Sequence, residues 1–140
     1  MSARSKARKH ALDLLYEADI RNSSALDLLA LRDVQEDGPD ARPVRDFTKL
    51  LIAGITDNNR KIDELIATYA QGWDMDRLPA VDRNILRLGI YEIVWSADLD
   101  DGIAIDEALT LAKDLSTDES AGYIHGVLGR ISSIKESIAI

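Results

Sequence analysis

The sequence predicts an all-α protein of about six or seven helices, and three observations support this fold class. Apolar residues recur at helical spacings along most of the chain. No stretch alternates apolar and polar residues between turn signals in the way that a half-buried strand does. Clusters of glycine, proline, asparagine and acidic residues separate the periodic segments, as expected of connections between helices.

The amino-terminal third of the chain predicts two helices followed by a mobile loop. The first helix spans about 5–21, and the second begins after Ser24, a favourable N-cap residue. The segment 33–42 then gathers acidic residues, Gly38 and Pro39 without an apolar period, which predicts the loop. The buried stripe of the first helix has members at helical spacing: Ala7, Ala11, Leu14, Leu15 and Ala18.

The middle of the chain predicts a long third helix and a central one. Pro43 suits the first turn of the third helix, which extends to about Ala70 with a bend at Gly54 or within 57–59. After a turn with a short helical piece at 72–82, the next helix over 81–96 is apolar on several sides. A helix that is apolar all round is a buried one, so this helix is expected to be the central one.

Two more helices complete the fold at the carboxyl end. The first covers about 103–115, and the last opens at Ser116 with Glu119 as the partner in a capping box. In the last helix, Gly122 and Gly126 stand four residues apart, which predicts close helix packing there. The residues 132–140 are expected to form a flexible tail.

Bulk composition limits the possible functions. The chain has 140 residues, of which 46% are apolar and 30% charged, so it is long enough for one domain over 1–140 with a real core. It contains no cysteine, which excludes disulfides and thiolate metal ligands. Its formal net charge of -8 argues against a surface that attracts nucleic acid everywhere, so any such site must be local.

Known signatures of catalysis, metal binding and cofactor binding are absent from the sequence. His10 and His125 are the two histidines, no hydrolase elbow surrounds a serine, and neither a phosphate-binding glycine loop nor HExxH occurs. DLDDG at 98–102 lacks the ligand alternation of a calcium loop and is better explained as a turn. We therefore expect a protein that is not an enzyme and that has no cofactor and no metal.

The start of the chain is the sequence's main functional signal. Arg4, Lys6, Arg8 and Lys9 stand together without an acidic residue, and Arg8, Lys9, Leu12 and Tyr16 follow steps that place them along one flank of a helix. Such a flank offers cations for phosphates and a ring on which a base can stack. The alternative is a solvated helix end, in which Lys9 pairs with Asp13. The residues alone favour neither.

Four stretches of the sequence resemble the NusB family of bacterial transcription antitermination factors. They are RSKARKHALDLLYEAD, FTKLLIAGITDNN, VDRNILRLGIYEIVW and AIDEALTLAKDLSTDESAGYIHGVLGRI, and they extend from residue 4 to about 131. The resemblance implies two packed three-helix bundles and a function without catalysis. It also implies binding of single-stranded boxA RNA together with NusE, a small-subunit ribosomal protein. The pair would join other Nus factors on RNA polymerase to suppress premature termination, notably in ribosomal RNA operons.

The resemblance also assigns RNA-binding residues at matching positions. The family's basic tract and the aromatic residue after it, the contacts at the start of the central helix, and the acidic and aromatic residues of the last helix fall on Arg4, Lys6, Arg8, Lys9, Tyr16, Asp82, Arg87, Glu119 and Tyr123. The acidic members would act as specificity elements, because a carboxylate can accept hydrogen bonds from base amino groups.

Two other functions remain to be weighed against RNA binding. A protein-binding scaffold with no direct RNA contact would use the basic start to dock an acidic partner. A fragment of an RNA cytosine methyltransferase is nearly excluded, because the chain has no cysteine and no cofactor loop. The sequence leaves open whether the protein is a monomer or a homodimer. A cytoplasmic location is expected, since acidic residues interrupt any signal-like segment and no run is long enough to span a membrane.

Overall fold

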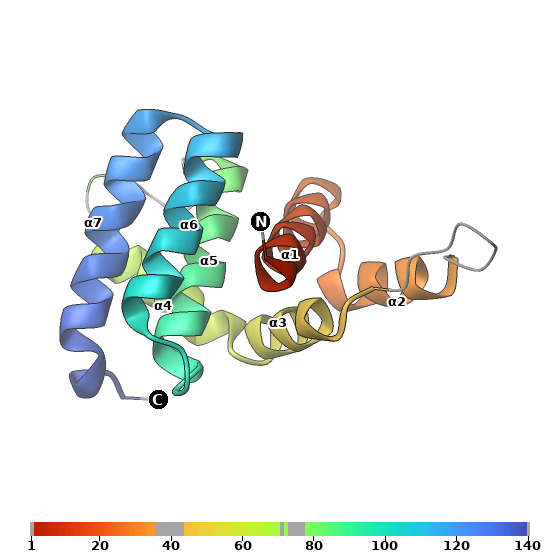
Figure 1. Ribbon diagram of the computed structural model, residues 1–140, viewed down its shortest axis with the longest axis horizontal. Helices are drawn as coiled ribbons and strands as arrows, with labels where there is room; N and C mark the ends of the chain where they lie inside the picture. The colour runs from red at the N-terminus through yellow and green to blue at the C-terminus, as the bar shows by residue number, and fades with distance from the viewer. Residues whose placement is uncertain (1, 36–43, 71, 73–77, 140) are drawn as a thin grey trace. The chain divides into compact units, whose positions relative to one another are not determined.

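The computed structural model describes residues 2–35, 44–70, 72 and 78–139 of the chain (Figure 1). Within these ranges it contains seven α-helices, one short 3₁₀ helix and no strand, which confirms the predicted all-α fold. The chain forms two compact units, Met1–Asp57 and Asn58–Ile140. None of the helices in the described ranges is long and apolar enough to cross a membrane.

The first unit is a three-helix arrangement of α1 (Ala3–Arg21), α2 (Ala25–Gln35) and α3 (Asp46–Asp57), in which each helix contacts the other two. The five residues predicted to form the buried stripe of α1 are all buried. The small side chain of Ala7 leaves its backbone carbonyl reachable from α3, where the Thr48 hydroxyl donates a hydrogen bond to it at 2.9 Å. Asn22 ends α1 with φ of 54°, a left-handed conformation that asparagine tolerates better than most residues.

The third helix that the sequence predicts is two helices in the structure. α3 ends at Asp57 and α4 (Asn59–Tyr69) begins two residues later, so the predicted bend at 57–59 is a complete break. Gly54 lies inside α3 and does not interrupt it. Pro43 and residues 36–42 of the predicted loop lie outside the described residues, whereas 33–35 belong to α2.

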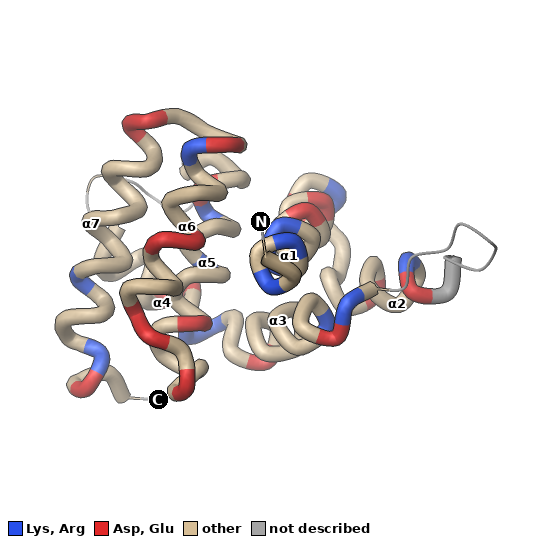
Figure 2. Tube along the Cα trace, in the orientation of Figure 1, with Lys and Arg blue, Asp and Glu red and all other residues tan. Residues whose placement is uncertain are grey.

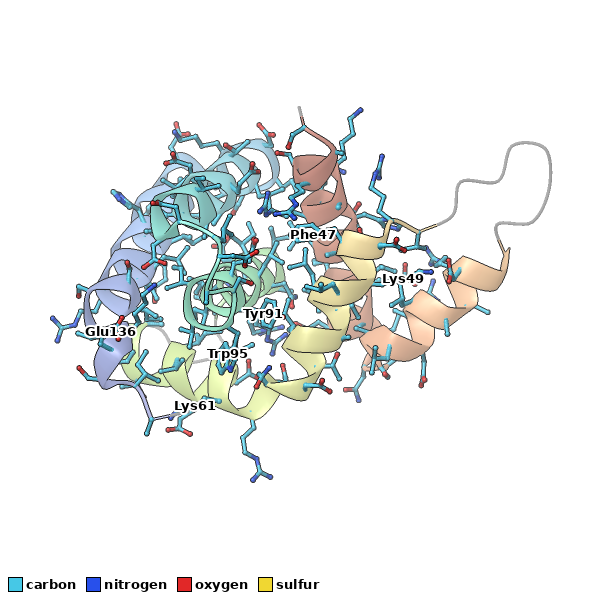
Figure 3. All side chains as sticks on the ribbon, turned by 60° about the horizontal axis from the view of Figure 1, so that its bottom comes forward. Phe47, Lys49, Lys61, Tyr91, Trp95 and Glu136 are labelled. Carbon is cyan, nitrogen blue, oxygen red and sulfur yellow. The ribbon has the colours of Figure 1, made fainter. Side chains whose placement is uncertain are left out.

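The second unit is built around α5 (Ala80–Trp95). This helix contacts α4, α6 (Asp101–Leu115) and α7 (Asp118–Ile134), and ten of its 16 residues are buried. It is therefore the central helix of its unit, as predicted. Helices α5, α6 and α7 contact one another pairwise as a three-helix bundle, to which α4 is added. Two aromatic rings of α5, Tyr91 and Trp95, stack with centroids 6.2 Å apart (Figure 3).

The prediction that 132–140 forms a flexible tail is wrong at its start. α7 continues to Ile134, and a 3₁₀ helix η1 (Lys135–Ser137) follows. The reason lies in α6, where the Asp101 carboxylate accepts hydrogen bonds from the Ser132 hydroxyl at 2.6 Å and from Lys135 Nζ at 2.8 Å. These contacts attach the end of α7 to the start of α6.

Candidate nucleic-acid interface

Three of the four predicted cations at the start of α1 are exposed. The side chains of Arg4, Lys6 and Lys9 reach solvent, and Figure 2 shows the basic segments near the amino-terminal end of this helix. No acidic residue occurs in the first turn of α1. Basic residues at a helix start oppose the helix dipole, and the Ser2 hydroxyl caps the helix instead by accepting a hydrogen bond from the Ser5 amide at 3.0 Å.

Arg8 differs from its neighbours because it is only 3% exposed. Its guanidinium lies 5.2 Å from the centroid of the Phe47 ring, and that of Arg4 lies 4.7 Å from the same ring. A ring face attracts cations electrostatically, so Phe47 holds both arginines. The Phe47 side chain is half-buried and helps to position the basic tract.

The predicted basic and aromatic flank of α1 is only partly exposed. Leu12 and Arg8 are buried, whereas Tyr16 is 40% exposed and Lys9 reaches solvent. Lys9 Nζ lies 3.5 Å from a carboxylate oxygen of Asp13, which is the pair expected if this segment is an ordinary solvated helix end. Such exposed pairs contribute little, so Lys9 remains a usable cation.

A pocket of about 310 Å³ in the second unit brings together three further predicted residues, Asp82, Glu119 and Tyr123. Asp82 comes from the first turn of α5, and the other two come from the first turns of α7. The N-cap of α7 is Thr117, whose hydroxyl accepts a hydrogen bond from the Ser120 amide at 3.0 Å. The capping box predicted for Ser116 and Glu119 is therefore wrong, and the exposed Glu119 side chain lines the pocket instead.

Asp82 gives the pocket a buried acceptor. The residue is 3% exposed, and its Oδ2 accepts a hydrogen bond from the Ser120 hydroxyl at 2.8 Å. Its Oδ1 is buried and accepts no hydrogen bond from the residues that the structure describes. Burial raises the pKa of the Tyr123 phenol above its ordinary value of 10.0, and the negative charge of Asp82 raises it further. The pocket thus offers an acceptor beside an uncharged aromatic ring.

Arg87 does not line this pocket. It lies further along α5, where Nε and Nη2 donate to the two carboxylate oxygens of Asp63 in α4, at 2.8 and 3.1 Å. Nη1 donates to Asn84 Oδ1 at 2.9 Å. The structure therefore places this predicted RNA-binding residue in an ion pair between two helices.

The described residues of the candidate site carry groups suited to binding a ligand. No group of three His, Asp or Glu side chains in the described ranges could hold a metal ion. In the predicted turn at 98–102, Asp100 Oδ1 accepts a hydrogen bond from the Gly102 amide at 2.7 Å, so it caps α6. The site offers cations, aromatic rings and hydrogen-bond acceptors, which is the chemistry of nucleic-acid recognition.

Comparison with known proteins identifies the family of the chain. The model of the NusB family matches residues 5–133. The transcription antitermination protein NusB of Saccharopolyspora erythraea is 50% identical over 139 residues, which cover 99% of this chain and 92% of the relative.

Two solved structures share the fold. NusB of T. maritima has a TM-score of 0.77 and 30% identity, with 98% of this chain and 99% of that chain covered. NusB in a crystal structure of antitermination factors NusB and NusE in complex with dsRNA also has a TM-score of 0.77, at 26% identity and with 93% and 96% of the chains covered. With the family model matched over nearly the whole length and a relative that is half identical, the chain belongs to the NusB family.

Proposed function

We propose that this protein is an antitermination adaptor that binds boxA single-stranded RNA together with NusE. In this role it joins other Nus factors on RNA polymerase in the cytoplasm and suppresses premature termination, notably in ribosomal RNA operons. It does so without catalysis, since the antitermination factors of the NusB family are not enzymes. A solved complex of NusB and NusE with dsRNA supports NusE and RNA as partners, although the RNA in that complex is double-stranded.

The observation that carries the proposal is the exposed cluster of Arg4, Lys6 and Lys9 in a chain of formal net charge -8. An acidic protein repels a polyanion over most of its surface, so RNA must bind where cations are concentrated. Each phosphate that these side chains neutralise releases counterions, which makes binding weaken as salt increases. Tyr16, two helical turns beyond Lys9, adds an exposed ring on which a base can stack.

The pocket of the second unit supplies base recognition in this proposal. Oδ1 of Asp82, which accepts no hydrogen bond from the described residues, and the carboxylate of Glu119 can accept hydrogen bonds from the amino groups of cytosine and adenine. The Tyr123 ring beside them offers a stacking surface. A carboxylate repels phosphate, so this pocket adds discrimination between bases and little general affinity.

The test is a fluorescence-anisotropy titration of a labelled boxA strand and a scrambled strand of the same length, at two salt concentrations, with and without NusE. We expect tighter binding of boxA, a steep loss of affinity as salt rises, and strengthening by NusE. Absence of RNA binding under all conditions, with NusE still bound, would instead identify a protein-binding scaffold. Sedimentation of the same samples distinguishes a monomer from a homodimer.

A further inference from the structure

A second groove lies in the second unit, between α4 and α7. Its volume is about 580 Å³, against about 310 Å³ for the Asp82 pocket. Tyr69 and Thr68 of α4 line one side, and Gly122, Tyr123 and Arg130 are among the lining residues of α7. Tyr123 lines both cavities, so the groove and the pocket meet at the same aromatic residue.

The floor of this groove is uncovered backbone. Gly122 and Gly126 lie four residues apart on the face of α7 that also carries Arg130. A Cβ atom built on either glycine would meet no atom of the described residues within 4 Å, apart from its chain neighbours and the helix's own nearby backbone. The prediction that this pair marks close helix packing is therefore wrong. The two glycines instead leave open space above the helix, which a flat group can occupy.

The other lining residues supply an aromatic and a charged component. The rings of Tyr69 and Tyr123 are half-buried, and Arg130 is exposed. Arg130 is the one charged side chain among the described lining residues, and its guanidinium forms no ion pair or hydrogen bond with any described residue, although its backbone oxygen accepts one from Ser133. In an acidic protein, an exposed cation that pairs with none of the described residues, beside a ring-lined groove, fits a ligand that combines a planar ring with a negative charge.

We propose that this groove binds a second nucleotide of the single-stranded RNA, adjacent to the nucleotide at the Asp82 pocket. The base lies over Gly122 and Gly126 against the tyrosine rings, and a phosphate contacts Arg130. This inference rests on the proposed function and extends its RNA path along α7. A peptide ligand is less favoured, because the described aromatic and charged lining residues, Tyr69, Tyr123 and Arg130, match the base and the phosphate of a nucleotide.

Gly126→Leu is the direct test, because it fills the groove. Gly129→Leu is the matched control, since Gly129 is in the same helix, also has no atom within 4 Å of a built Cβ, and does not line the groove. Leucine is a better helix former than glycine, so both variants are expected to melt at or above the wild-type temperature. In anisotropy titrations with boxA RNA, we expect binding about tenfold weaker for G126L, as for one lost stacked base, and unchanged for G129L.

A charge variant tests the phosphate contact independently. Arg130→Gln is expected to weaken RNA binding and to lower the slope of log affinity against log salt by about 0.7, the value for one phosphate on a single strand. Lys113→Gln, which removes an exposed cation of α6 outside the groove, is expected to leave the slope unchanged. In nitrogen-15 spectra, the amide signals of Gly122 and Gly126 should shift as RNA is added.

The outcomes separate the two proposals. If the wild-type chain binds no RNA with or without NusE, the proposed function fails and this inference fails with it. If the wild type binds RNA and both G126L and R130Q bind it equally well, the inference alone is overturned. If G126L loses NusE while RNA affinity is unchanged, the groove is a protein-binding surface and the nucleotide proposal is likewise overturned.

Discussion

The guanidinium of Arg87 in α5 and the carboxylate of Asp63 in α4 form a two-pronged ion pair, with N···O distances of 2.8 and 3.1 Å. Paired N–H donors matched to two carboxylate oxygens make this one of the stronger polar contacts available to side chains. The Arg87 side chain is 12% exposed and the Asp63 side chain 29%. This contact joins two helices of the second unit, which is a structural role for a residue predicted to bind RNA.

Arg87→Gln is therefore expected to lower the free energy of unfolding by about 1–3 kcal/mol, because it leaves a partly buried carboxylate without its partner. Urea denaturation followed by circular dichroism measures this loss. Arg87→Lys should recover only part of it, since an ammonium group cannot form the two parallel hydrogen bonds. An unchanged unfolding midpoint in Arg87→Gln would mean that the pair contributes as little as most surface pairs do.

Arg8 and Lys6 are expected to respond differently to the same substitution. Arg8→Gln removes a buried cation that contacts the Phe47 ring, so stability should fall by about 0.5–2 kcal/mol. Lys6→Gln removes an exposed cation, so the melting temperature should stay constant while the salt slope of RNA binding falls by about 0.7. Thermal melts and anisotropy titrations on both variants make the comparison.

The opposite result would change the role assigned to Arg8. If Arg8→Gln melts with the wild type and lowers the salt slope as Lys6→Gln does, the Arg8 guanidinium contacts phosphate directly. Phe47→Leu keeps an apolar side chain but removes the ring face that contacts the guanidiniums of Arg4 and Arg8. It therefore tests the contribution of the ring without changing the charge of the basic tract.

Helices could be predicted from the sequence because their apolar period is a local property. The buried stripe of α1 and the central position of α5 follow directly from that period. Helix ends were less predictable, since the cap at Thr117 depends on one side-chain hydrogen bond and the extension of α7 past Ser132 on two. Spacing alone cannot decide such contacts.

The sequence predicted which types of residue form the candidate site, but it could not predict which of their side chains are exposed. Asp82, Glu119 and Tyr123 do line one pocket. The burial of Arg8 depends on Phe47, which reaches it only through the packing of α3 on α1. The exposure of Gly122 and Gly126 in α7 could not be predicted from the sequence either, because a four-residue spacing of glycines occurs both in tightly packed helices and along open grooves. Which of the two applies depends on the neighbouring helix.

The close helix approach in the second unit occurs at Gly89 of α5. A Cβ built there would lie 2.8 Å from Cδ1 of Leu128 in α7, and Leu128 is fully buried. Gly89→Ala is therefore expected to destabilise the protein by about 1–2 kcal/mol through overpacking, despite a gain of up to about 1 kcal/mol in helix propensity. Gly129→Ala, with open space at its Cβ, should show only the gain.

A double-mutant cycle identifies Leu128 as the cause. Leu128→Val removes the δ-methyl groups that the new Cβ would meet, so it should cost less in the Gly89→Ala background than in the wild type. Equal costs in the two backgrounds, measured by urea denaturation, would place the strain of Gly89→Ala elsewhere.

The last prediction concerns the pH dependence of the contact between Asp101 and the end of α7. Burial raises the pKa of Asp101, but hydrogen bonds from Lys135 and Ser132 and the charge of Lys135 outweigh it, so the pKa lies below the ordinary value of 3.8. A carboxylate with a lowered pKa stabilises the folded state fully above the unfolded value. This contribution falls as the pH drops below about 3.8 and is lost once the folded carboxylate also binds a proton.

Asp101→Asn is therefore expected to lower the free energy of unfolding at pH 7 by about 0.5–1 kcal/mol, since the pair is partly exposed. The difference from the wild type should shrink as the pH is lowered from 5 toward 3, where the wild type loses the same charge. Lys135→Gln should reproduce both the loss at pH 7 and its decline, whereas Lys113→Gln, on the same helix as Asp101 but outside this contact, should not. Urea denaturation at pH 7, 5 and 3 measures these differences, and a difference that stays constant over this range would show that the charge of Asp101 does not hold the end of α7.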